Sequence, residues 1–451
     1  MANRARVIYQ SEALYAGTVD ATGHHFTASA DSWATKTGYS TIDEIPDGAD
    51  VRTGIMQLRR VQSANYSFSV NRQDVNQFGQ LSRIDSVSIE PPTVSLDFSY
   101  YLTNGINEAI MGFNVEGDSQ ALTNEVLLGK TNASDSPGGK NFFILTTPES
   151  SDAVKNADIT TAENSVIALG NGYVSNYSIE ASVGGMPTAN VTIDGLNLRS
   201  YTGTASLPIP ALDTKFGTPI EGVEFSLPPA VSGKGEATIG DDKIWGSTDD
   251  GWTANNEGFG VEGISCLRPG DISMSLGADG RAGLFENLPN DERANSTSSE
   301  VDDALLNNNS GSAHIQSFSI DVPVSRSTIQ RLGNPYGYAK VTDFPVNISV
   351  SVNAILSDLK EGNVASLLFD QEEHDLVFTM REPSQSGIGP VALQYKIKGA
   401  RLEGESFSSS IGDNKSVDLT FTAQVGGPQD EVNGIFISGS RNATTISDYF
   451  A

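Results

Sequence analysis

The chain has 451 residues, of which 38% are hydrophobic, and it contains 45 glycines and 19 prolines, a composition typical of a folded protein with many short strands and turns. At roughly 100–200 residues per domain this length predicts two or three domains, and two is the working number. The formal net charge is −28, from 56 acidic and 28 basic residues, and no basic cluster occurs. This excludes nucleic-acid binding through dense phosphate neutralisation.

The sequence contains one cysteine, Cys266, so an intrachain disulfide cannot form. Stability must come from packing or from oligomer contacts, which fits assembly in a reducing cytoplasm. The N-terminal segment carries Arg4 and Arg6 but lacks the apolar centre of a secretory signal, and no apolar run reaches about 18 residues. We therefore expect a soluble chain that is not addressed to a membrane.

The first strongly patterned segment, residues 62–102, returns as residues 316–356 without a gap, so that residue 62 corresponds to residue 316 and residue 102 to residue 356. We call this the first correspondence. Polar, glycine and proline positions coincide under it, including Gly79 with Gly333 and Pro91 with Pro345. Because glycine and proline occupy special backbone conformations, their coincidence indicates the same turns in both segments.

Both segments end in a strand pattern that alternates between apolar and polar residues. Val94, Leu96 and Phe98 are expected on one face, with Thr93, Ser95, Asp97 and Ser99 on the other. The second segment repeats the apolar set as Val346, Ile348, Val350 and Val352. Each strand is predicted to bury one face and expose a polar one.

A short helix follows each of these strands in the prediction, at Asn107–Val115 and at Glu361–Phe369. A second pair of segments, Val174–Ile193 and Leu402–Phe421, also matches residue by residue, and we call this the second correspondence. Each of the two segments predicts a β-hairpin around a glycine-containing turn. Their spacing is smaller than that of the first correspondence, which places an insertion in the first copy, around Asn132–Lys155.

The sequence therefore predicts a mainly β protein with tandem duplicated β-barrel or sandwich domains, each with one short flanking helix and long loops. The first domain is expected at residues 1–205 and the second at 206–451, with Tyr201–Gly222 as the linker because it contains three prolines. Loop-rich insertions at about 241–312 comprise Asp241–Gly260 and Gly277–Ser312.

The exposed strand faces carry Ser, Thr, Asn and Asp, and lysine is scarce. Isolated β domains commonly protect their edges with lysine, proline or bulges. The edges are therefore either covered by the chain's own loops or used to pair with neighbouring molecules, and the latter favours closed rings and stacked assemblies.

No residue set predicts catalysis, a cofactor or a metal. His24 and His25 are adjacent, whereas His314 and His374 lie far apart, so no metal-ligand spacing emerges. Asp249–Gly251 and Gly277–Gly280 resemble fragments of calcium loops but lack the complete ligand set. Cys266 has no base beside it in sequence and is predicted to be a buried small apolar residue.

The run Arg72–Gly79, preceded by an alternating polar strand and followed by PPTVSLDFSYY, resembles the major tail (tube) proteins of tailed bacteriophages. The duplication resembles the type in which two tube domains are fused. The resemblance implies inner strands that line a channel and three chains per ring, with pseudo-sixfold symmetry. Stacked rings would then form the hollow tail tube, the conduit for DNA delivery.

The same resemblance implies a set of partners and a location. The partners would be other copies of the chain, a tape-measure protein in the lumen, tail terminator and baseplate or tip proteins at the ends, and genomic DNA that passes without specific binding. The protein would be assembled in the host cytoplasm and located in the virion tail.

Candidate ring or seam contacts are Arg72, Gln73, Asp74 and Arg326. An arginine present in both copies beside a turn could bridge to acidic neighbours across a domain seam. The alternative is an arginine that caps the turn of its own unit.

Two other classes of function remain open from the sequence. The first is a tandem β-domain binding protein, such as a tail fibre, a capsid decoration protein or an adhesin, for which Trp245 and Trp252 in the predicted loops leave room. The second is an enzyme, for instance a polysaccharide-degrading β protein, which ranks third because no catalytic motif supports it.

Overall fold

The structure of the 451-residue chain is a computed structural model. It describes residues 12–18, 55–115, 117, 119–129, 139–147, 153, 165–202, 207–213, 218–220, 224–225, 227, 266–276, 314–334, 336–337, 339–355, 373–381, 391–408 and 416–439. The predicted loops at 241–260 and 277–312, with Trp245 and Trp252, lie outside the described residues.

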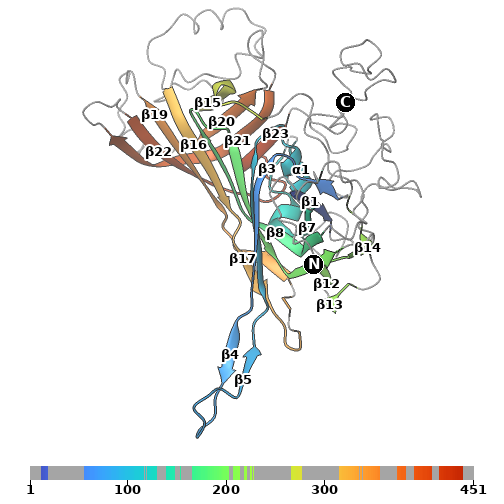
Figure 1. Cartoon of the computed structure of the whole chain (residues 1–451). Coiled ribbons are helices and arrows are strands. Elements are labelled where there is room, and N and C mark those ends of the chain that lie inside the picture. Colours follow the sequence, from blue (N-terminus) through green and yellow to red (C-terminus); the bar gives the residue numbers. More distant parts are fainter. Residues whose placement is uncertain are drawn as a thin grey trace, which may run out of the picture.

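The protein is mainly β, as predicted, and its largest element is one 15-stranded antiparallel sheet (Figure 1). The strands of the first half are β1 (Glu12–Thr18), β2 (Met56–Gln57), β3 (Val61–Ser69), β4 (Arg72–Val75), β5 (Asp85–Ser88), β6 (Thr93–Tyr101), β7 (Lys140–Thr146), β8 (Ser165–Ser182), β9 (Thr188–Gly195), β10 (Asn197–Thr202), β11 (Leu207–Pro208), β12 (Leu212–Asp213), β13 (Thr218–Pro219) and β14 (Glu224–Phe225). Those of the second half are β15 (Ile272–Leu276), β16 (His314–Pro323), β17 (Arg326–Ile329), β18 (Ala339–Thr342), β19 (Asn347–Ile355), β20 (His374–Arg381), β21 (Val391–Ser408), β22 (Ser416–Gln424) and β23 (Gly434–Gly439). A 3-10 helix, η3 (Pro269–Asp271), precedes β15.

Eight of these strands form a continuous inner sheet in the order β3-β6-β9-β8-β16-β19-β22-β21. The alternation expected from the sequence is confirmed, since Val94, Leu96 and Phe98 are buried while the residues between them are more exposed. Val350 and Val352 in β19 are buried in the same way. The sheet thus has one apolar face on the core and one polar face.

The strands β8 and β21, of 18 residues each, connect the inner sheet to the outer strands. The first part of β8 pairs with β7 and β10, and that of β21 pairs with β20 and β23. Each strand contains one residue with positive φ, Asn171 at 49° and Gly399 at 72°. These two residues are equivalent when the second correspondence is extended towards the N-terminus, and they mark the place where each strand passes from outer to inner pairing.

The pairing order of the first half recurs in the second half, together with its irregularities. A bulge between Val61 and Ser63 in β3 recurs between Ile315 and Ser317 in β16, in agreement with the first correspondence. The bulge in β8 between residues 174 and 176 likewise recurs in β21 between residues 402 and 404, in agreement with the second. The boundary at residue 205 and the division into two domains remain predictions.

One large hydrophobic cluster extends through strands of both halves, from Leu14 to Ile437. A second cluster lies in the first half and includes Ile209 and Ala211. These two residues belong to the segment Tyr201–Gly222, which was expected to be a linker. The segment instead continues β10, forms the β12–β13 pair and contributes buried side chains, because its apolar residues outweigh the effect of its prolines.

Two short helices, α1 (Ile106–Met111) and α2 (Asn124–Leu128), lie in the first half. The expected helix at Asn107–Val115 is present but ends earlier, because Gly112 adopts the left-handed conformation that closes helices (φ 101°). The second helix was not predicted, although Thr123 caps it by accepting a hydrogen bond from the Val126 backbone N–H at 3.3 Å. The helix expected at Glu361–Phe369 lies outside the described residues.

Candidate assembly interface

The two halves of the chain meet where β16 pairs with β8. Seven residue pairs form this junction, from Ser317 opposite Ser182 to Pro323 opposite Asn176. On its apolar side Ile320 and Val322 are both 0% exposed. The junction joins the inner strands of both halves into one sheet, and it shows how this chain pairs one β unit with another.

Arg326, at the start of β17, connects the second half to backbone carbonyls of the first half. Its Nε donates to the carbonyl oxygen of Val174 at 3.0 Å, and its Nη1 donates to that of Leu127 at 3.4 Å, while Nη2 donates to the carbonyl of Val126. The guanidinium carbon lies 5.2 Å from the ring centre of Tyr173, within cation–π range. The carbonyls of Val126 and Leu127 lie at the C-terminal end of α2, where the helix dipole favours a cation.

Burial lowers the pKa of Arg326 to about 10, and the nearby Tyr173 and Asp194 act in the opposite direction. The guanidinium therefore stays charged at neutral pH while largely removed from water. A charged donor in this position forms strong hydrogen bonds. Removing it would take this donor from three carbonyls, of which that of Leu127 also accepts from the Thr342 hydroxyl.

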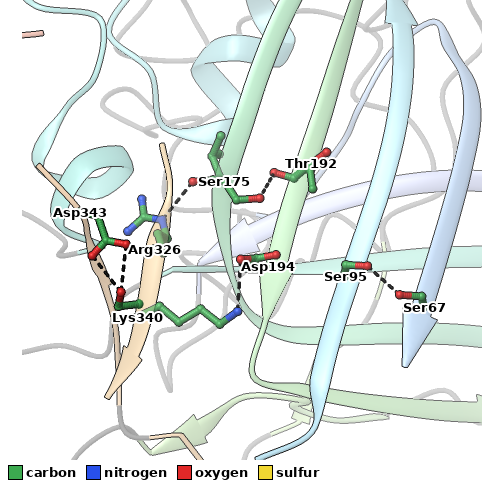
Figure 2. Close-up of polar contacts among 10 residues, drawn as sticks. Ser67, Ser95, Ser175, Thr192, Asp194, Arg326, Lys340 and Asp343 are labelled. Carbon is green, nitrogen blue, oxygen red and sulfur yellow. Dashed lines mark hydrogen bonds and ion pairs between the residues drawn. The ribbon is translucent and has the colours of Figure 1, made fainter. Parts of the chain in front are cut away.

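An ion pair lies beside Arg326, between Lys340 Nζ in β18 and Asp194 Oδ2 in β9, at 3.4 Å (Figure 2). The Lys340 side chain is 9% exposed and that of Asp194 29%. Burial lowers the pKa of Lys340, while Asp194 raises it. This pair also crosses from the second half to the first, so the β17–β18 hairpin is bound to the other half by charge as well as by hydrogen bonds.

A buried carboxylate, Glu108 of α1, lies among three tyrosines from different strands. Its Oε1 accepts hydrogen bonds from the hydroxyls of Tyr100 in β6 at 2.6 Å, Tyr177 in β8 at 2.9 Å and Tyr395 in β21 at 3.4 Å. The hydroxyls of Tyr177 and Tyr395 are 3.0 Å apart. Burial raises the pKa of Glu108, and the hydrogen bonds from the tyrosines partly oppose this. The cluster holds strands of both halves around one helix.

The inner sheet has two open edges among the described strands. β3 pairs only with β6, and the second part of β21 pairs only with β22. On β3, Tyr66 is 48% exposed and Phe68 is 53% exposed, although both lie on the face that is buried elsewhere. Under the first correspondence their equivalents in β16 are the fully buried Ile320 and Val322. The β3 edge therefore has the apolar surface of a sheet junction without a second strand beside it.

The polar face of the inner sheet carries mostly short side chains that satisfy one another. Ser63 bonds to Ser99 and Ser67 to Ser95, each at 2.7 Å, and Thr192 donates to Asp97 at 2.7 Å (Figure 2 shows the second pair). The charged residues that the described strands place on this face are mainly acidic: Asp97, Glu180, Asp194, Asp321, Glu403 and Asp418, with Arg401 as the base. The face is a hydroxyl-rich, negatively charged surface.

The β4–β5 hairpin projects well beyond the rest of the molecule (Figure 1). At its tip, Phe78 and Leu81 are fully exposed, at 104% and 109%. On the corresponding β17–β18 hairpin, Leu332 is 103% exposed. Exposed apolar residues gathered at a projecting tip indicate a contact with another molecule.

The structure separates the four residues that the sequence singled out. Arg326 lies at the seam between the halves, and its acceptors are backbone carbonyls and not acidic side chains. Arg72 is exposed on β4, and its side chain makes no hydrogen bond or ion pair with the described residues. Gln73 lies opposite Val87 in the hairpin, and Asp74 forms an exposed ion pair with Arg83 at 3.0 Å.

Sequence reasoning missed the residues that surround these positions. Neither Tyr173 nor the Glu108 cluster has a motif, because their partners come from strands up to 287 residues away. The one available signal was Glu108 itself, a charged residue on a short helix whose other residues, apart from Asn107, are apolar.

Within the described part of the chain, no group of three or more His, Cys, Asp or Glu side chains is placed to hold a metal ion. No described helix combines the length and the apolar character needed to cross a membrane. Cys266, predicted to be buried, is half-buried, and its sulfur lies 3.7 Å from that of Met186.

No protein-family model matches the sequence, and no curated protein matches it. Among solved structures, the tube-terminating cap of the anti-feeding prophage is 7% identical with a TM-score of 0.24, covering 39% of this chain and 93% of that one. The PVC sheath-tube complex, an extracellular contractile injection system in the extended state, gives 10% identity and a TM-score of 0.23 with the same coverage. A chain from the virion of a native gene transfer agent is 12% identical with a TM-score of 0.17, and the match covers 27% of this chain and 80% of that one. These neighbours are components of phage-like particles.

Proposed function

We propose that this protein is a structural subunit that closes into rings, and that the rings stack into a hollow tube of the kind found in phage tails. The observation that carries the proposal is the inner sheet, which contains one complete junction between β units and two open edges of matching character. A strand-rich chain with unprotected edges is suited to pairing with copies of itself.

The internal junction supplies the register of the proposed contact between chains. In it, β16 pairs with β8, and the corresponding open strands are β3 and β21. Within a chain, Asp321 lies opposite Ser178. The first correspondence converts Asp321 to Ser67 and the second converts Ser178 to Ser406, so Ser67 of one chain should lie opposite Ser406 of the next.

The same register fixes the neighbouring pairs and the surface that the contact covers. Asn65 lies opposite Ser408, and Ser69 lies opposite Gly404. The contact would cover the exposed Tyr66 and Phe68, as the internal junction covers their buried equivalents in β16. The proposed junction therefore removes from water the apolar surface that distinguishes the β3 edge.

Three chains per ring is the stoichiometry that the resemblance to fused tube domains implies. Each chain has eight inner strands, so a ring of three chains would hold three times eight inner strands. At a strand spacing of about 4.8 Å and a tilt of about 40°, a closed barrel of that size has a backbone radius of roughly 24 Å. After allowance for side chains, the channel is wide enough for a DNA duplex.

The polar face of the inner sheet is proposed to line this channel. Its hydroxyl groups already bond to one another, so they offer few free donors to a phosphate. Its carboxylates repel DNA over a Debye length of about 8 Å at physiological salt. Such a wall lets DNA pass without binding it, and we propose that it also surrounds a tape-measure protein during assembly, with terminator and baseplate or tip proteins at the tube ends.

A structural role in a virion tail also accounts for the buried charged groups among the described residues. The buried charged groups, Arg326 and Glu108, are bound to carbonyls and tyrosines that connect the two halves, where they serve the architecture. We propose on this basis that the chain is not an enzyme.

The proposed junction can be tested by disulfide crosslinking. In a Cys266→Ala background, the pair Ser67→Cys and Ser406→Cys should give covalently linked multimers under mild oxidation, because directly opposite residues in antiparallel strands meet disulfide geometry. The matched control is Ser178→Cys with Asp321→Cys, which should crosslink within one chain. The pair Asn65→Cys with Ser406→Cys, which is out of register, should link poorly.

Equal crosslinking of the in-register and out-of-register pairs would show that the register is wrong. A chain that crosslinks only within itself, and stays monomeric at high concentration in negative-stain images, would rule out the ring and favour the alternative of a tandem β-domain binding protein.

A further inference from the structure

The β4–β5 and β17–β18 hairpins are built alike. Arg72 lies opposite Ser88 in the first hairpin, as Arg326 lies opposite Thr342 in the second. At the tips, Gly79 and Gly333 have nearly equal positive φ values, 88° and 87°. The two arginines therefore hold the same position on equivalent hairpins, yet of these two only Arg326 has hydrogen-bond partners among the residues that the structure describes.

The acceptor of Arg326 on β8 also has a counterpart. Val174, whose carbonyl accepts the Arg326 Nε–H, precedes the bulge between β8 and β9. Leu402 precedes the corresponding bulge between β21 and β22. Next to this contact, the Val324 N–H donates to the carbonyl of Ser175, the bulged residue, at 2.9 Å. The counterpart of Ser175 in β21 is Glu403.

We propose that Arg72 of one chain binds the backbone carbonyl of Leu402 at the β21 bulge of a second copy, forming a clasp beside the strand junction. This inference rests on the ring proposed above, and it adds a specific residue and a neutral acceptor to it. The hairpin base would thereby form a lateral contact with the neighbouring chain of the same ring. The tip residues Phe78 and Leu81 stay available for a contact along the tube axis.

The clasp between chains should be weaker than the one within the chain. Tyr173, which lies against Arg326, corresponds to Arg401, so the stacked ring is absent from the second site. The ion pair of Lys340 with Asp194 corresponds to Ser86 and Thr422, which carry no charge. These differences fit a junction that forms only when subunits assemble, next to one that forms as the chain folds.

Sedimentation velocity of the full chain over a range of concentrations tests the clasp. Arg72→Ala should weaken each contact between chains about 10- to 100-fold, the usual effect of losing a hydrogen bond from a charged donor. Arg72→Lys should lie between Arg72→Ala and the wild type, because lysine keeps the charge but loses the planar fork. Thermal unfolding of the monomer should not change, since Arg72 is exposed.

Two control variants fix the meaning of the result. Arg83→Ala removes another exposed arginine from the same hairpin and should have little effect. Glu403→Gln removes the nearest carboxylate on β21 and should also have little effect, because the proposed acceptor is a carbonyl. A loss in either control equal to that of Arg72→Ala would overturn the clasp, as would normal assembly of Arg72→Ala.

The disulfide experiment separates failure of the clasp from failure of the ring. If the Ser67–Ser406 pair crosslinks and Arg72→Ala assembles normally, the ring stands and the clasp is wrong. If that pair does not crosslink while the control within one chain does, the ring itself is wrong and the clasp falls with it.

Discussion

At the scale of residues, the buried charged groups of this protein connect segments that are distant in sequence. Glu108 accepts hydrogen bonds from Tyr100, Tyr177 and Tyr395, and Arg326 donates to carbonyls of α2 and β8. A buried charge without partners is costly, so each of these groups favours the one arrangement of the halves that supplies its partners. Both groups therefore specify how the halves pack, in addition to any stability they contribute.

The Glu108 cluster gives a pH-dependent prediction. Because burial raises the pKa of Glu108, the folded state binds a proton more readily than the unfolded chain. The contribution of Glu108 to stability is therefore greatest at pH values below its ordinary pKa of 4.5, and it is lost as the pH rises through the raised pKa. Glu108→Gln should remove this part of the pH dependence. The Tm of the wild type should therefore fall relative to the Tm of the variant as the pH rises.

Tyr395→Phe provides the control for this experiment. It removes a hydrogen bond that lowers the pKa of Glu108, so the loss of stability should extend to higher pH. Thermal unfolding followed by circular dichroism across the acidic to neutral range measures both effects. Parallel curves for wild type and Glu108→Gln would show that another group titrates in this window.

At the scale of elements, the two hairpins have the same construction but different surroundings. The base of β17–β18 is bound to the first half through Arg326 and Lys340, whereas β4–β5 projects freely among the described residues (Figure 1). Fully burying a large apolar side chain contributes about 1.5–3 kcal/mol. In the proposed tube, burial of two such residues at one tip would be enough to decide whether rings stack.

Phe78→Ser with Leu81→Ser should therefore separate ring formation from tube formation. The proposed junction at β3 and β21 does not involve the tip, so rings should form as in the wild type, while tubes in negative-stain images become short or absent. Val432→Ser, which replaces a 69% exposed apolar residue outside both hairpins, is the control and should give tubes of normal length. Loss of rings in the tip variant would show that the tip acts within the ring.

At the scale of the whole molecule, the net charge of −28 opposes assembly, and the proposed junction must overcome it. Like-charged subunits repel, and salt shortens the range of this repulsion from about 30 Å at 0.01 M to about 8 Å at 0.15 M. Backbone pairing and a guanidinium bound to a carbonyl depend little on salt. The balance therefore shifts towards assembly as the ionic strength rises.

Sedimentation velocity should accordingly show a larger fraction of rings at higher ionic strength. The ring should have three times the mass of one chain, which is 47.8 kDa. A ring fraction that falls with added salt would indicate a junction held by ion pairs. A mass corresponding to six chains would contradict two pairing units per chain.

The sequence alone determined the features that depend on local pattern. Alternation predicted which faces of β6 and β19 are buried. The first correspondence predicted the same turns in both segments, because glycine allows particular backbone conformations, and Gly79 and Gly333 do share a positive φ. The acidic, hydroxyl-rich character of one face followed from the same alternation. The sequence also singled out Arg72 and Arg326, with either acidic partners across a seam or a cap of the turn of their own unit as the expected role.

Only the tertiary structure decided what depends on contacts between distant segments. The pairing of β8 with β16, the carbonyls around Arg326 and the tyrosines around Glu108 join residues up to 287 positions apart, and no local pattern encodes such distances. The same holds for the segment at Tyr201–Gly222, whose composition suggested a linker although its apolar residues complete a core. Hydrophobic burial is non-directional, so the sequence shows that a face will be covered, and the fold decides by what.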